Sequence, residues 1–208
     1  SLKSALKEVE AVLGVEVKKV IASIPSYLAK FDLVEGHITF EDENHIINSS
    51  DLVAVLDNAI DSYRMEDKYA FMTIVPINFT LDGYEQIEDP KNLVSSHLKN
   101  KSIIITTPKK NIASVVSLVT GIGVEVVDIT INALGEINVF KDQKIKEGIG
   151  AVINVGASVT TVSLYNKGIV VKQALLNMGG DDIDSDLATI YKLTNKQGRT
   201  LKEKFAFA

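Results

Sequence analysis

The chain has 208 residues, of which 46% are hydrophobic and 24% are charged, with a net charge of −5 and no cysteine. Disulfide scaffolds and cysteine-based zinc sites are therefore excluded. The 22 basic residues are interspersed with 27 acidic ones, so the chain lacks the dense positive field that a nucleic-acid backbone requires. The composition indicates one or two globular domains, without an apolar run of the roughly 20 residues that a membrane-spanning helix needs.

The first half of the chain predicts helices alternating with strands. Residues 2–13 place apolar side chains on one helical face, and Gly14 follows as a C-cap. Residues 69–81 are rich in β-branched and aromatic residues but contain Pro76, which predicts a strand that is bulged or interrupted at a sheet edge. The other expected elements are a strand at 17–24, a strand with a loop over 31–48, a helix at 52–60 with N-cap oxygens from residues 49–51, and a strand at 102–106.

The second half continues with a helix in which Thr107 is the expected N-cap and Pro108 the first residue. The charged stretch 141–147 is expected to be a hinge, and an Asn-x-Gly turn at 166–168 favours a hairpin. Further elements are a helix before Gly121, a strand at 124–131, a helix at 132–140, strands at 150–155, 160–165 and 169–176, a helix from 179 to about 193, and a last helix. The fold class is mixed α/β (α+β).

The segment most informative about function is 153–161, which joins two predicted strands by a turn of small residues. Backbone amides in such a turn can approach an anion closely, and the hydroxyls of Ser158, Thr160 and Thr161 add donors. An ordinary tight turn, with threonine present for its strand propensity, is the alternative interpretation.

The order of hairpin, strand, paired glycines and helix resembles the second phosphate loop of the actin-like ATPase superfamily, whose usual pattern is Asp-x-Gly-Gly-Gly-x-Thr-Thr. Here the loop consists of Asn154, Gly156, Ala157, Ser158, Thr160 and Thr161. Gly179 and Gly180 with Asp186 resemble the superfamily's later Gly-Gly element, where a helix N-terminus meets the nucleotide.

Within that superfamily the chain resembles the FtsA family of bacterial cell-division proteins. Residues 75–82 and 87–90 are similar to the FtsA signature around its inserted module, and residues 111–124 continue the likeness. The resemblance implies four parts: 1–14 as the end of a first actin-like lobe, 15–107 as an inserted strand-helix-strand-strand module, 108–147 as a return to that lobe, and 148–208 as the start of a second lobe. Because the chain begins without Met inside a helical pattern and stops just after another, we expect a fragment of a longer protein.

Departures from the family pattern concern the nucleotide. Asn154 replaces the loop's Asp, which in the family helps to hold Mg²⁺, and an amide lacks the charge that this cation prefers. Ala157 and Ser158 replace two loop glycines. In place of the usual Ala-Glu-x-x-Lys, Arg199 reverses the charge of the Glu while Lys202 keeps the Lys. We therefore expect no enzymatic activity and no tight binding of Mg-ATP by this chain, although the resemblance associates Mg-ATP with the full-length protein.

The resemblance implies a cytoplasmic scaffold at the inner face of the membrane at the division site. Such a scaffold self-associates, binds FtsZ and other division proteins, and reaches the membrane only through parts absent from this chain. We expect contacts with proteins rather than nucleic acid, with strand edges at 69–81 or 102–106 as candidate surfaces. The alternatives are a pilus-assembly scaffold of the same superfamily and an actin-like ATPase enzyme.

Overall fold

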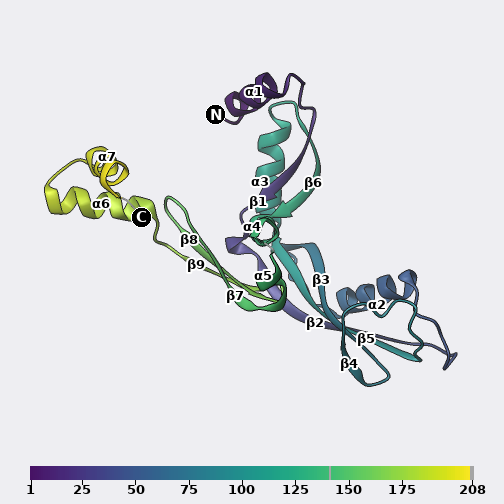
Figure 1. The fold of residues 1–208 in the computed structure, drawn as a ribbon. Helices are drawn as coiled ribbons and strands as arrows, with labels where there is room; N and C mark the ends of the chain where they lie inside the picture. Colours follow the sequence, from purple (N-terminus) through teal and green to yellow (C-terminus); the bar gives the residue numbers. More distant parts are fainter. Residues whose placement is uncertain (141, 207–208) are drawn as a thin grey trace. The chain divides into compact units, whose positions relative to one another are not determined.

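The computed structural model describes residues 1–140 and 142–206, and only the backbone of Glu85. The chain divides into two compact units, residues Ser1–Val139 and Phe140–Ala208, and each is described by itself. Both units combine helices with β-sheets (Figure 1), which confirms the predicted mixed α/β class.

The larger sheet of the first unit has four antiparallel strands in the order β2-β5-β3-β4. One helix, α2, packs against it and begins with Asn48 as N-cap, whose side chain accepts from the amides of Ser50 and Asp51. The cap is therefore one residue earlier than the predicted residues 49–51. The bounds are β2 Lys30–Thr39, α2 Ser49–Ser62, β3 Tyr69–Leu81, β4 Tyr84–Ile87 and β5 His97–Pro108.

Apolar side chains fill the layer between α2 and this sheet. Val34 of β2, Ala59 of α2 and Ile104 of β5 form one buried cluster. A second buried cluster extends it with Ile47, Val55, Phe79, Leu81 and Leu98. Gly36 marks where β2 and α2 cross most closely, because a Cβ built on it would overlap the carbonyl oxygen of Val55.

The predicted strand at 102–106 lies in the interior of the sheet. β5 runs from His97 to Pro108 and pairs with β2 on one side and with β3 on the other. The expectation of an exposed edge at 102–106 is therefore wrong. Pro108 is also the N-cap of the following helix, without a side-chain hydrogen bond, so the expected cap at Thr107 is wrong by one residue.

β3 has the predicted bulges. Its register with β5 shifts between Phe71 and Thr73 and again between Pro76 and Asn78. On its other side β3 pairs with β4 only at Phe79 and Leu81. Among the described residues, the part of β3 that precedes Phe79 therefore has one unpaired edge, as the proline predicted.

The rest of the first unit surrounds a two-stranded parallel sheet made by β1 and β6. α3 packs against both strands, and α1 ends at Gly14 with a φ of 69°, as predicted. β1 lies inside the predicted module 15–107 but pairs with β6 rather than with the four-stranded sheet. The bounds are α1 Leu2–Leu13, β1 Lys19–Ile24, η1 Ser26–Leu28, α3 Lys109–Thr120, β6 Glu125–Ile131 and α4 Asn132–Phe140.

The second unit is a three-stranded antiparallel sheet in the order β7-β8-β9, followed by two helices that pack against each other. The predicted hairpin turn is confirmed, since Lys167 and Gly168 have φ values of 49° and 73°. The expected hinge contains a short helix, α5, and Lys141 lies outside the described residues. The bounds are α5 Gln143–Glu147, β7 Ile149–Val155, β8 Thr160–Asn166, β9 Ile169–Leu176, α6 Gly180–Tyr191 and α7 Asn195–Phe205.

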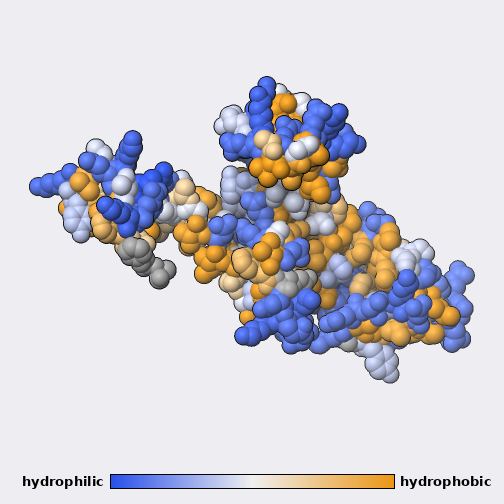
Figure 2. Space-filling model, turned by 45° about the horizontal axis from the view of Figure 1, so that its top comes forward, coloured by the Kyte–Doolittle hydropathy of each residue, from blue (hydrophilic) through white to orange (hydrophobic). Residues whose placement is uncertain are grey.

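In the space-filling view, α6 and α7 are covered mostly by hydrophilic residues (Figure 2). Within the described residues, no helix is long and apolar enough to cross a membrane.

Candidate functional site

The predicted phosphate loop connects β7 to β8 in the second unit. β7 ends at Val155 and β8 begins at Thr160. The turn between them is closed by the amide of Gly156, which donates to the carbonyl of Val159 at 2.9 Å. Asn154 and Thr161 face each other across the β7–β8 ladder. The loop is thus a tight turn at the end of an antiparallel pair.

The N-terminus of α6 lies directly against this loop. The amide of Gly180 donates to the carbonyl of Gly156 at 2.9 Å, and the amide of Asp181 donates to the carbonyl of Ala157 at 2.8 Å. Two further amides are satisfied within the helix start, since Gly179 donates to a carboxylate oxygen of Asp182 at 2.7 Å and Asp182 donates to the Gly179 carbonyl at 3.2 Å. The amides that a helix normally leaves open at its N-terminus all have partners here.

The paired glycines allow this close approach. A Cβ built on Gly179 would overlap the carbonyl oxygen of Ala157, and one on Gly180 would lie 3.3 Å from the Nζ atom of Lys202. The hydroxyl of Thr160 donates to the carbonyl of Met178 at 2.8 Å, which ties the start of β8 to the segment before α6. The predicted loop and the predicted glycine pair therefore meet in space.

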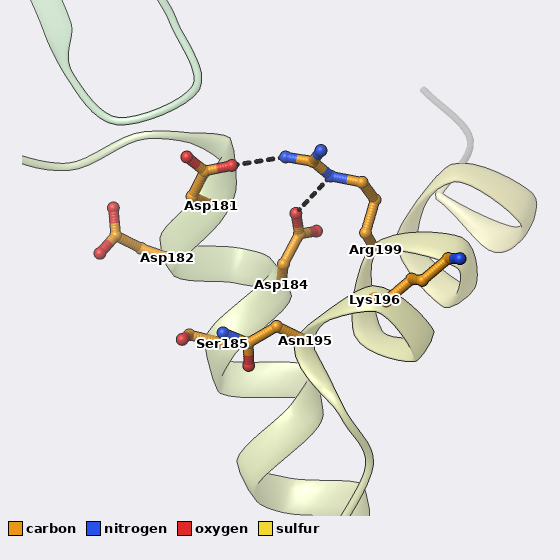
Figure 3. Close-up of a pocket in the computed structure, with 7 residues that line it drawn as sticks. All are labelled: Asp181, Asp182, Asp184, Ser185, Asn195, Lys196 and Arg199. Carbon is orange, nitrogen blue, oxygen red and sulfur yellow. Dashed lines mark hydrogen bonds and ion pairs between the residues drawn. The ribbon is translucent and has the colours of Figure 1, made fainter.

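Charged side chains continue the junction from α6 to α7 (Figure 3). Nη2 of Arg199 lies 2.6 Å from Oδ1 of Asp181, and its Nε lies 3.1 Å from Oδ2 of Asp184. The Nζ of Lys202 lies 2.7 Å from Oδ1 of Asp184 and donates to the carbonyl of Gly180 at 2.7 Å. The hydroxyl of Ser158 donates to the other carboxylate oxygen of Asp181 at 2.9 Å. The loop, α6 and α7 thus share one polar network.

Asp184 is the buried centre of this network. Its side chain is 5% exposed, whereas those of Arg199 and Lys202 are 53% and 23% exposed. The hydrogen bond from Lys202, followed by that from Arg199, lowers the pKa of Asp184. In return, Asp184 and then Asp181 raise the pKa of Arg199. The buried carboxylate is therefore held in its charged form by two cations.

A cavity of about 500 Å³ adjoins the network. It is lined by Asp181, Asp182, Asp184, Ser185, Asn195, Lys196 and Arg199. Asp186, which was expected to face a nucleotide, is exposed on α6 and does not line this cavity. Asp181 and Asp184 were not predicted to be site residues. Their spacing of three residues on α6, matched by that of Arg199 and Lys202 on α7, is the signal that could have found them.

A second candidate surface lies in the first unit, where the unpaired edge of β3 borders an apolar groove of about 380 Å³. Phe71 is 40% exposed and Val127 is 50% exposed. Such an edge presents unpaired backbone groups to an incoming strand. The groove is lined by Phe71 and Met72 of β3, Ile112 and Val116 of α3, and residues 126–129 of β6.

Comparisons with known proteins agree with the fold of the first unit and with the resemblance along the chain. Residues 29–106 match the family model described as the SHS2 domain inserted in FtsA, which is narrower than the predicted module 15–107. The whole chain aligns with the cell division protein FtsA of Streptococcus pneumoniae at 24% identity, covering 45% of that protein. It also aligns along its whole length with FtsA of Bacillus subtilis, at 23% identity and 47% coverage. The chain spans about half the length of these relatives.

Among solved structures, a chain of the PilM–PilN type IV pilus biogenesis complex is similar to this chain. The match covers 97% of this chain and 55% of that one. The TM-score is 0.60 and the sequence identity is 12%, so the likeness is one of fold. This likeness in fold agrees with the predicted fold class.

Proposed function

We propose that this chain, whose residues 29–106 match the SHS2 domain inserted in FtsA and which aligns along its whole length with FtsA proteins, is part of a cell-division scaffold that acts through protein contacts. The observation that carries the proposal is the match of this module together with its four-stranded sheet, in which α2 covers one face.

The contact surface we propose is the unpaired edge of β3 with the groove beside it. On the side of β4, the part of β3 before Phe79 has no strand partner among the described residues, and Phe71 and Met72 supply apolar contacts next to this edge. An extended segment of a second copy or of a division protein would add backbone hydrogen bonds along the edge and place alternate side chains in the groove. This arrangement supports self-association and recruitment through one surface.

In the longer protein we propose that this scaffold works on the cytoplasmic face of the membrane at the division site and links FtsZ to that membrane. The names of the relatives support a role in division. We propose that parts of the longer protein outside this chain make the contacts with FtsZ and with the membrane. We propose no catalytic role for the chain, because Asn154 lacks the carboxylate charge that a Mg²⁺-dependent ATPase requires.

The test replaces an exposed apolar residue of the groove. In the intact protein, Phe71→Lys places a charge beside the β3 edge, and self-association measured by sedimentation velocity should weaken by about tenfold or more. Tyr84→Lys is the matched control, because Tyr84 is 77% exposed on β4 and lies outside the groove. Unchanged assembly and unchanged capture of division proteins by Phe71→Lys would refute this surface.

A pilus-assembly scaffold is the second candidate, and the similarity in fold to the PilM–PilN complex favours it. Binding of the intact protein to a peptide from a pilus protein, together with no binding to the FtsZ C-terminal tail, would support that function. An actin-like ATPase enzyme is the third, and measurable ATP turnover by the intact protein would support it.

A further inference from the structure

The residues at the β7–β8 loop do not fit the magnesium nucleotide that the fold family implies. A helix N-terminus binds phosphate through amides that have no other partner. Here the amides of Gly180 and Asp181 already donate to the carbonyls of Gly156 and Ala157. A phosphate group would have to break these bonds, and it would then meet carbonyl oxygens, which repel an anion.

The charge at this position is also unfavourable for a polyanion. Asp181 and Asp182 occupy the first turn of α6, where their carboxylates interact favourably with the helix dipole. Arg199 faces them from α7, but its guanidinium is already paired with Asp181 and Asp184. A nucleotide would therefore approach two carboxylates, with the neighbouring arginine already neutralised.

We propose that this end of the second unit is closed by its own polar network, in which Arg199 bridges Asp181 and Asp184, in place of a bound nucleotide. The network begins at Ser158 in the loop, passes through Asp181 to Arg199, and continues through Asp184 to Lys202. It joins the loop to α6 and α6 to α7 without any external ligand. Arg199 is the positioning residue, because it is the side chain that bridges Asp181 and Asp184.

Close backbone packing supports the same conclusion. A Cβ on Gly198 would overlap the carbonyl oxygen of Asp184, and a Cβ on Gly179 would overlap that of Ala157. The glycines at both ends of the network thus bring backbone against backbone. This packing leaves no room for a ligand between the loop and α6, and the ion pairs hold the elements in that position. The inference concerns the second unit and stands apart from the proposed scaffold function.

The test is calorimetric unfolding of the 208-residue chain with and without Mg-ATP. We expect the melting temperature (Tm) of the wild-type chain to be unchanged by millimolar Mg-ATP, whereas a nucleotide bound with micromolar affinity would raise it by several degrees. Arg199→Glu restores the charge that the family has at this position and should lower the Tm of the second unit by about 5 °C or more. Arg199→Lys keeps the positive charge and should lower the Tm by less than Arg199→Glu does.

Lys196→Glu is the matched control, because Lys196 lines the same cavity and lies on the same helix as Arg199. No ion pair of Lys196 is seen among the described residues. Its Tm should change by no more than about 2 °C. A rise of several degrees in the wild-type Tm on adding Mg-ATP would overturn the proposal. Equal effects of Arg199→Glu and Lys196→Glu would overturn the bridging role of Arg199. The wild-type titration decides the proposal even if Arg199→Glu does not fold.

Discussion

The sheet with α2 in the first unit and the loop with α6 and α7 in the second are held together by different forces. In the first, Val34, Ala59 and Ile104 are buried between helix and sheet. In the second unit, Val170 of β9 and Ala188 of α6 are the only apolar side chains buried among the described residues, and the charged side chain of Asp184 on α6 is buried as well. Because apolar burial holds the first region together, its stability should depend on side-chain volume. Because ion pairs hold the second region together, its stability should depend on charge and pH.

The largest effect should come from adding a side-chain atom where the first region has no free space. Gly36→Ala forces a methyl group against the carbonyl of Val55 and the backbone of Ala59, and should lower the free energy of unfolding by about 3 kcal/mol. Chemical denaturation of the chain followed by circular dichroism measures this.

Gly135→Ala is the control for that substitution. A Cβ on Gly135 meets open space and the residue lies within α4, so alanine should be neutral or stabilise by up to about 1 kcal/mol. If the two variants unfolded alike, the close crossing of β2 and α2 would not be a constraint on the fold.

Removing the buried charge of the second region should have an intermediate effect. Asp184→Asn takes the carboxylate from between Lys202 and Arg199, and should lower the Tm of the second unit by several degrees at pH 7. Asp186→Asn on the exposed side of α6 should have little effect. Calorimetry resolves the difference between the two.

The pH dependence of that difference follows from the lowered pKa of Asp184. A carboxyl group with a lower pKa in the folded state than in the unfolded state contributes stability at pH values above its unfolded pKa of about 4. That contribution is lost as the pH falls through the folded pKa. The Tm difference between wild type and Asp184→Asn should therefore be complete at pH 7 and disappear in acid; a difference that persisted unchanged in acid would show that the charge of Asp184 is not its cause.

The smallest of these effects should come from the cap of α2. Asn48→Ala removes the side-chain oxygen that accepts from Ser50 and Asp51, at an expected cost of about 1 kcal/mol. Asn48→Ser keeps an oxygen at the same position and should lose much less. Equal losses in denaturant titrations of the two variants would argue against the capping role of that oxygen.

Much of the fold was predictable because local patterns determine local structure. Gly14 ends α1 with a positive φ, and Lys167 with Gly168 forms the tight hairpin turn, both as the sequence indicated. The bulged edge strand around Pro76 was predicted for the same reason. In each case the residue type determines which backbone conformations are accessible at its own position.

The interior position of β5 was not predicted because pairing between strands is not local. The strand was predicted only at 102–106, although Lys99 and Lys101 alternate with buried Leu98 and Asn100, a period of two that indicates a longer strand. The pairing of β1 with β6 likewise joins segments about a hundred residues apart, and neither segment carries a sign of its partner.

The position of the candidate site was predictable, but the hydrogen-bond and ion-pair partners of its residues were not. The small residues of the β7–β8 turn and the paired glycines before α6 were recognised, and the structure brings them together. The orientation of the Gly156 and Ala157 carbonyls toward α6 depends on how the hairpin packs, which composition and spacing do not specify. The same holds for the pairing of Arg199 with aspartates on another helix.

Hydrogen exchange of the Gly180 and Asp181 amides, followed by NMR on the 208-residue chain, tests most directly whether the β7–β8 loop and α6 are closed by their own network. Both amides donate to loop carbonyls, so we predict that they are protected without any ligand and that Mg-ATP leaves their protection unchanged. Rapid exchange of both amides in the free chain, with protection appearing only when Mg-ATP is added, would contradict the closure of this end of the second unit by its own network.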